Sequence, residues 1–173
     1  MVLVLLVALM SGAGAGVAAA AAADKGVARL ASADGKDVGT VELVETLAGV
    51  MMTVTLKGVT PGIHGFHVME FGKCEGTFAS AGNILNPLAA KHGLLSDEGP
   101  AMGDLPNLHV PASGELVVEF LGPFVTLAPD GDGSLIREGG TSFIIHEMAD
   151  DHKTHPDGNS GARMACGVVK LAQ

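Results

Sequence analysis

The chain has 173 residues and is acidic, with 10 Lys and Arg against 19 Asp and Glu and a net charge of −9. This charge argues against nucleic acid or an anionic membrane as a partner, because both attract basic surfaces. Without its apolar N-terminal run, the chain from 24 to 173 has the length of one domain with a core of its own.

The chain begins with the apolar run MVLVLLVALMSGAGAGVAAAAAADKG, which ends in small residues. Alanine at every candidate cleavage position is typical of a secretory signal peptide, and we expect residues 1–23 to be removed. A membrane anchor is the alternative, but Gly and Ala interrupt the run before it reaches the length of a spanning helix. The protein is therefore expected to be exported, periplasmic or extracellular, without membrane attachment after cleavage.

Short β-type runs separated by turn residues follow this leader. They cover 27–31, 38–46, 50–56, 63–71, 115–125, 142–146 and 164–171. Apolar residues alternate with others along several of them, as at Met52, Val54 and Leu56, so one strand face points to a core. No long segment of residues 24–173 has the 3.6-residue period of a helix. The pattern predicts an all-β sandwich or barrel.

Two polar regions interrupt the strands. Residues 72–109 are rich in Gly, Pro, Asn and Asp, and a loop of this length within one domain is usually functional or disordered. The second region, EMADDHKTHPDGNSGAR, lies between the last two predicted strands. Because sites are often built from loops on a rigid scaffold, these regions are the expected location of function.

The two cysteines, Cys74 and Cys166, are expected to form a disulfide, as an even pair in an exported chain usually does. Closing so long a loop would contribute about 4 kcal/mol in the chain-entropy model. Metal-binding thiols are the alternative, but neither cysteine lies in a C-x-x-C arrangement.

The densest group of ligand-type side chains lies between Pro61 and His92. His67 and Met69 are two apart in an extended run, so both leave the same face of a strand, while Phe66 and Val68 face the other way. One face therefore offers ligand atoms and the other offers core.

Five segments resemble the copper/zinc superoxide dismutase family. They are HGFHVMEFGKC, SAGNILNP, KHGLLSDEGPAMGDLPNL, IIHEMADD and GNSGARMACGVV, and the resemblance extends over 27–171. It implies an eight-stranded antiparallel Greek-key barrel, an immunoglobulin-like sandwich with two long functional loops. It also implies an antioxidant oxidoreductase of the bacterial exported type that converts superoxide to oxygen and hydrogen peroxide. The sequence does not decide whether the protein forms a homodimer.

In this family four histidines hold copper, and one of them bridges to zinc, which takes two further histidines and an aspartate. The resemblance places the copper ligands on His67, Met69, Ile84 and His146, and the zinc ligands on Ile84, His92, Ala101 and Asp104. Histidine is replaced at three of these positions, Met69, Ile84 and Ala101. Each metal therefore keeps two of its family ligands, and the bridge is lost.

The remaining donors predict different outcomes for the two metals. His92 and Asp104 cannot complete a tetrahedral zinc site, so zinc is expected to bind weakly or not at all. Two imidazoles and a thioether suit Cu(I), so copper is expected as Cu(I) on His67, Met69 and His146. Core packing is the alternative role for Met69.

Because dismutation needs both copper oxidation states, the sequence predicts weak or no activity, and whether the chain is an enzyme stays open. The alternative is a non-catalytic exported relative that binds Cu(I) or serves as a metal-free structural protein.

By resemblance, Asp150 matches the aspartate that links the two metal sites, and Arg163 matches the catalytic residue that receives the substrate anion. Arg163 is also expected to hold the loop 150–162 through backbone carbonyls. His152 and His155 could form a second metal pair, although a solvated loop is the favoured interpretation. Backbone hydrogen bonding is expected for His64, and no catalytic role is expected for His109.

Overall fold

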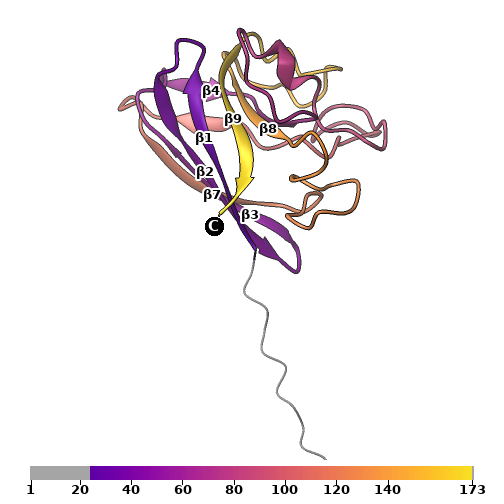
Figure 1. The fold of residues 1–173 in the computed structure, drawn as a ribbon. Coiled ribbons are helices and arrows are strands. Elements are labelled where there is room, and N and C mark those ends of the chain that lie inside the picture. Colours follow the sequence, from indigo (N-terminus) through magenta and orange to yellow (C-terminus); the bar gives the residue numbers. More distant parts are fainter. Residues whose placement is uncertain (1–23, 173) are drawn as a thin grey trace, which may run out of the picture.

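The computed structural model describes residues 24–172 (Figure 1). The expected signal peptide, residues 1–23, lies outside the described residues. Across the part that is described, no helix is long and apolar enough to cross a membrane.

Residues 24–172 form nine strands and one short 3-10 helix. The elements are β1 (Lys25–Ser32), β2 (Asp37–Thr46), β3 (Gly49–Leu56), β4 (Gly62–His64), β5 (Phe66–Met69), η1 (Ala79–Ala81), β6 (Leu108–Val110), β7 (Leu116–Gly122), β8 (Ser142–His146) and β9 (Arg163–Leu171). Only Gly65 separates β4 from β5, so these two strands belong to one extended run of the chain. The nine strands therefore correspond to eight extended runs. The all-β prediction is confirmed.

Seven strands form one antiparallel sheet in the order β5-β8-β9-β1-β2-β3-β7, and β4 pairs with β6 in a second, two-stranded sheet. The order is not the chain order, because β8 and β9 return to pair with β5 and β1. Figure 1 shows a curved sheet with the long loops gathered on the side of β8. This arrangement positions the loops over β5 and β8, which carry His67 and His146.

The core follows from the alternation of apolar residues. Val41, Val54 and Val118 lie at paired positions of β2, β3 and β7, so they share one face of the sheet. On β5 and β8, Phe66 and Phe143 stack with ring centroids 5.2 Å apart. Every residue of β5 and β8 is buried, so loops must cover the face opposite the core.

The disulfide prediction is confirmed, because Cys74 and Cys166 are bonded, with their Cα atoms 5.7 Å apart. This bond fixes the long middle loop to β9. Cys74 and Cys166 belong to a second apolar cluster on the loop side of the sheet. The cluster also contains Met69, Phe78, Ala81, Ile84, Ala101 and Ile144.

Several strand boundaries differ from the prediction, most in the run 63–71 and in β7, which ends at Gly122 and not at position 125. The run expected over 63–71 is divided at Gly65 and ends at Met69. The strand β6 was missed, since it has only three residues and lies close to Pro106 and Pro111, which weaken any local strand signal.

Candidate functional site

His67 and His146 lie on the paired strands β5 and β8 and meet edge to face, with ring centroids 4.9 Å apart. His67 Nε2 donates to Asp150 Oδ2 at 3.0 Å, and His146 Nδ1 donates to the carbonyl oxygen of Gly161 at 3.2 Å. The opposite nitrogens, His67 Nδ1 and His146 Nε2, are buried and have no hydrogen-bond partner within residues 24–172. Since each ring carries its proton on the bonded nitrogen, both unpartnered nitrogens present a lone pair.

The lone pair of His146 stays free at neutral pH. Burial lowers the pKa of this imidazole to about 4, and the neighbouring His67 and Arg163 act in the same direction. A neutral imidazole is the form that binds a metal ion.

Met69 is two residues beyond His67 and belongs to the loop-side apolar cluster, as predicted from the alternation along β5. Its backbone pairs with Ile84 in an isolated bridge, which brings two of the three replaced positions together. Phe66 and Val68 belong to the main core instead. Along β5, Met69 therefore faces the loop-side cluster, while Phe66 and Val68 face the main core, as the alternation predicts.

His92 and Asp104 are also brought together. His92 Nδ1 donates to Asp104 Oδ1 at 2.7 Å, and His92 Nε2 donates to Asp150 Oδ1 at 3.0 Å. Burial alone would lower the pKa of His92, but the two carboxylates outweigh it and raise this pKa to about 9. Both ring nitrogens of His92 are therefore protonated and hydrogen bonded.

Asp150 links the two halves of the site, because its carboxylate accepts from both His67 and His92. Burial acts to raise the pKa of Asp150, yet the hydrogen bonds from His67, His92 and the His152 backbone hold it well below its usual range. The Asn107 side chain fixes the backbone of Asp150, accepting from its N–H at 2.9 Å and donating to its C=O at 2.8 Å.

Sequence reasoning missed two residues that position Asp150. Asn107 is in the DLPNL segment, but nothing in its local pattern indicates contact with a residue 43 positions away. Gly158 has φ of +65°, and a Cβ atom at this position would lie 1.7 Å from Asp150 Oδ1. A glycine is needed there for both reasons.

Three buried ligand-type residues of the two halves lie close together. One side-chain nitrogen or oxygen of each of His67, His92 and Asp104 lies within 4.8 Å of those of the other two. All three are almost fully buried. His92 bonds directly to Asp104, and Asp150 joins His92 to His67.

The predicted loop contact of Arg163 is wrong. Its guanidinium donates to the carbonyl oxygens of Phe78 and Gly82 at 2.7 and 2.6 Å, and so holds the loop 78–82 instead of 150–162. The reason is that the disulfide brings the middle loop alongside the start of β9, where Arg163 lies.

His152 and His155, for which a metal pair was the less favoured interpretation, lie in different surroundings. His152 is partly buried, with Nδ1 3.3 Å from Asp150 Oδ2, so the solvated-loop interpretation is wrong for this residue. His155 is exposed, and its Nδ1 accepts from the backbone N–H of His92 at 3.4 Å.

The roles of the other two histidines agree with expectation. The ring nitrogens of His64 lie 2.8 and 2.9 Å from the carbonyl oxygens of His146 and Thr60, as expected for a structural residue. His109 lies exposed on β6.

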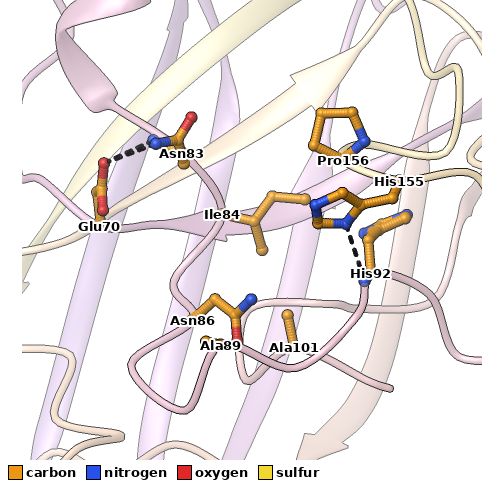
Figure 2. Close-up of a pocket in the computed structure, with 9 residues that line it drawn as sticks. All are labelled: Glu70, Asn83, Ile84, Asn86, Ala89, His92, Ala101, His155 and Pro156. Atoms are coloured by element: carbon orange, nitrogen blue, oxygen red, sulfur yellow. Dashed lines mark hydrogen bonds between the residues drawn. The ribbon is translucent and has the colours of Figure 1, made fainter. Parts of the chain in front are cut away.

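A cavity of about 400 Å³ opens beside the site (Figure 2). Ile84, Ala101 and His92 form part of its lining, and Figure 2 shows Ile84 beside the ring of His155 and Ala101 below it. Neither Ile84 nor Ala101 has a donor atom for a metal. The cavity therefore borders the two zinc-ligand positions at which the histidine of the family is replaced.

The family model for copper/zinc superoxide dismutase (SODC) matches residues 38–169. "Superoxide dismutase [Cu-Zn] 2" of Aquifex aeolicus is 44% identical over 148 residues, which cover 84% of this chain and 86% of that protein. "Superoxide dismutase-like protein YojM" of Bacillus subtilis is 40% identical over 144 residues, which cover 82% and 74%.

Two solved structures of a SOD-like protein from Bacillus subtilis are similar to the present fold. One aligns with a TM-score of 0.79 and 39% identity, covering 82% of this chain and 96% of that chain. The other is a double mutant in which a tyrosine and a proline are replaced by histidine, with a TM-score of 0.80, 39% identity and coverage of 82% and 95%.

Proposed function

The chain belongs to the copper/zinc superoxide dismutase family, and from this premise we propose that it is an exported member with a copper half-site, no zinc site and little or no dismutase activity. The observation that carries the proposal is the pair of buried, unpartnered nitrogens of His67 and His146. The Cys74–Cys166 disulfide supports export, because such bonds persist in oxidising compartments.

Copper fits the residues of the first half. His67 Nδ1 and His146 Nε2 are buried lone pairs without another partner in the described chain, so a metal ion would satisfy both. Met69 lies on the same strand face as His67, and its thioether favours the softer Cu(I). Copper bound there would supply the change of oxidation state that dismutation requires.

Zinc does not fit the second half. Ile84 and Ala101 offer no ligand atom. Both nitrogens of His92 donate hydrogen bonds to carboxylates, to Asp104 and to Asp150. A structural zinc site needs four donors in a closed tetrahedron. No step of the chemistry is therefore assigned to zinc.

Arg163 is the residue that would receive superoxide. Its guanidinium has five N–H donors, and the contacts with Phe78 and Gly82 use two of its nitrogens. The remaining N–H groups and the positive charge suit a small anion. The loss of activity is therefore assigned to the metal ligands and not to anion binding.

Metal analysis together with kinetics tests the proposal. Purified protein supplied with both metals is expected to hold about one copper and no zinc per chain, and the copper should give no Cu(II) resonance signal. Its dismutation rate should be far below that of an intact relative measured in parallel. A chain with bound zinc and full activity would contradict the proposal, and a chain without any metal would support a structural role.

A further inference from the structure

We propose that four residues, Asp104, His92, Asp150 and His67, form an imidazole–carboxylate network that closes the predicted zinc position and holds loop 92–104 without a metal ion. This inference rests on the proposed absence of zinc. In this proposal the network orders loop 92–104. It also fixes the orientation of the His67 ring before copper binds.

The carboxylate of Asp104 joins the two ends of loop 92–104. Its Oδ1 accepts from His92 Nδ1 at 2.7 Å. Its Oδ2 accepts from the backbone N–H groups of Gly93 and Ala101 at 2.7 and 2.9 Å. Asp104 is only 5% exposed, so these three donors replace the water that the carboxylate loses on burial. These hydrogen bonds satisfy the Asp104 carboxylate without a metal ion.

His92 is closed to a metal in this arrangement. Carboxylate oxygens only accept, so the proton on each ring nitrogen points at a carboxylate, Asp104 on one side and Asp150 on the other. No lone pair is left on the ring. A zinc ion would have to displace a proton from a buried hydrogen bond and would gain no donor from Ile84 or Ala101.

The same network leaves one ring nitrogen of His67 without a hydrogen bond, in contrast to His92. Asp150 Oδ2 accepts from His67 Nε2 at 3.0 Å, which leaves the lone pair on Nδ1 directed away from the carboxylate. An outer carboxylate of this kind fixes the tautomer and orientation of a ligand ring. The network therefore closes His92 and keeps His67 open.

Asp150 is itself fixed by Asn107 and His152. The backbone N–H of Asp150 can only donate, so the oxygen of the Asn107 amide must face it, and the Asn107 nitrogen then lies 3.1 Å from His152 Nε2. His152 Nε2 is therefore the acceptor, while its Nδ1, 3.3 Å from Asp150 Oδ2, has no hydrogen bond within residues 24–172. The backbone N–H of His152 donates to Asp150 Oδ1 at 2.6 Å.

Hydrogen exchange of the mature protein after extensive chelation provides the test. The amides of Gly93 and Ala101 are expected to be protected in the chelated protein, and adding equimolar zinc should leave their exchange rates unchanged. Protection that appears only after zinc is added would overturn the proposal. So would zinc binding that is lost on changing His92 or Asp104.

Substitutions separate the network from a general loss of stability. Asp104→Ala should increase exchange at Gly93 and Ala101 at least about 10-fold, because it removes the oxygen that accepts from both N–H groups. The matched control is Asp97→Ala, which removes an exposed carboxylate in the same loop for which residues 24–172 show no hydrogen bond. Equal effects of the two changes would contradict the network.

If Asp104→Ala does not fold, Asn107→Asp provides the second variant. It puts a carboxylate against the C=O of Asp150, so exchange in loop 92–104 should rise while the disulfide and the main sheet stay intact; unchanged exchange would overturn the proposal. Copper is absent from all these measurements, so a failure of copper binding would contradict the proposed function and leave this result unaffected.

Discussion

The His67 ring meets the His146 ring edge to face at a centroid distance of 4.9 Å, and each ring keeps one buried nitrogen without a partner among residues 24–172. Copper bound between them should therefore depend on both imidazoles. We expect His146→Ala to abolish copper binding, measured as copper content after loading and desalting. His155→Ala changes an exposed histidine outside this pair and should have no effect. Retention of copper by the His146 variant would refute the half-site.

The role of Met69 can be tested at nearly constant volume. Met69→Leu removes the thioether and keeps the apolar packing, so its cost in unfolding free energy should stay below about 1.5 kcal/mol. If the sulfur is a ligand, Cu(I) affinity in competition with a Cu(I) chelator should fall, while the midpoint of urea unfolding changes little. An unchanged affinity would show that Met69 only packs.

Arg163 should contribute to stability through the loop 78–82. Arg163→Lys keeps the charge but cannot reach both carbonyl oxygens with a planar fork, so one hydrogen bond to Phe78 or Gly82 is lost. We expect a decrease in unfolding free energy of about 1–2 kcal/mol, measured in urea. Arg29, an exposed residue of β1, provides the control as Arg29→Lys, and an equal effect there would contradict this role.

The sequence predicted those features that depend on local spacing. The period of two along β5 places Phe66 in the core and His67 on the ligand side, and the two cysteines could pair in only one way. The hydrogen bonds from Asn107 to Asp150 and from Arg163 to Phe78 were not predictable in this manner. They join a side chain to a backbone group far along the chain, and such contacts leave no periodic signal.

His152 shows the same limit. Its sequence, between Asp151 and Lys153, is that of an exposed polar loop, yet its side chain is partly buried against Asp150. The residue has φ of +58°, a conformation that sequence does not indicate for histidine. The contact depends on how the loop folds back over β8.

Acid should loosen the loop after β8 through Asp151. Its carboxylate accepts from the Thr154 hydroxyl, the backbone N–H groups of Thr154 and Lys153, and the Asn159 amide. These bonds lower the pKa of Asp151 to about 2 from the usual 3.8. Because the folded pKa is the lower one, the contribution to stability is complete above about pH 4 and is lost as the pH falls through about 2.

Thr154→Val tests this assignment, since it removes the largest cause of the shift. The carboxyl carbon of Asp151, followed by NMR, should then titrate at higher pH than in the parent. The exposed Asp97 in the same spectrum serves as the internal control, and a titration midpoint of Asp151 that does not move would contradict the hydrogen-bond origin of the shift.

The last prediction concerns restoring the missing ligands. Met69→His, Ile84→His and Ala101→His together should recreate both family metal sites, because the sheet, the loops, Asp150 and Arg163 are already in place. Single changes should do little. Ile84→His supplies the bridging ring, but without Ala101→His the zinc still lacks a donor and cannot compete for His92. The gains in dismutation should therefore be strongly non-additive.

Stability of the triple variant should depend on zinc, whereas that of the parent should not. Without metal, an imidazole at position 84 lies in the loop-side apolar cluster as an unsatisfied polar group, at a cost of about 1–3 kcal/mol. With zinc, the same ring becomes a ligand, and binding to the folded state raises the melting temperature. Zinc must then take the proton from between His92 and Asp104, so loop 92–104 should change from zinc-independent to zinc-dependent protection. A parent that already dismutates superoxide as fast as the loaded triple variant would show that other residues compensate for the replaced ligands, and His152, beside Asp150, would be the first to test.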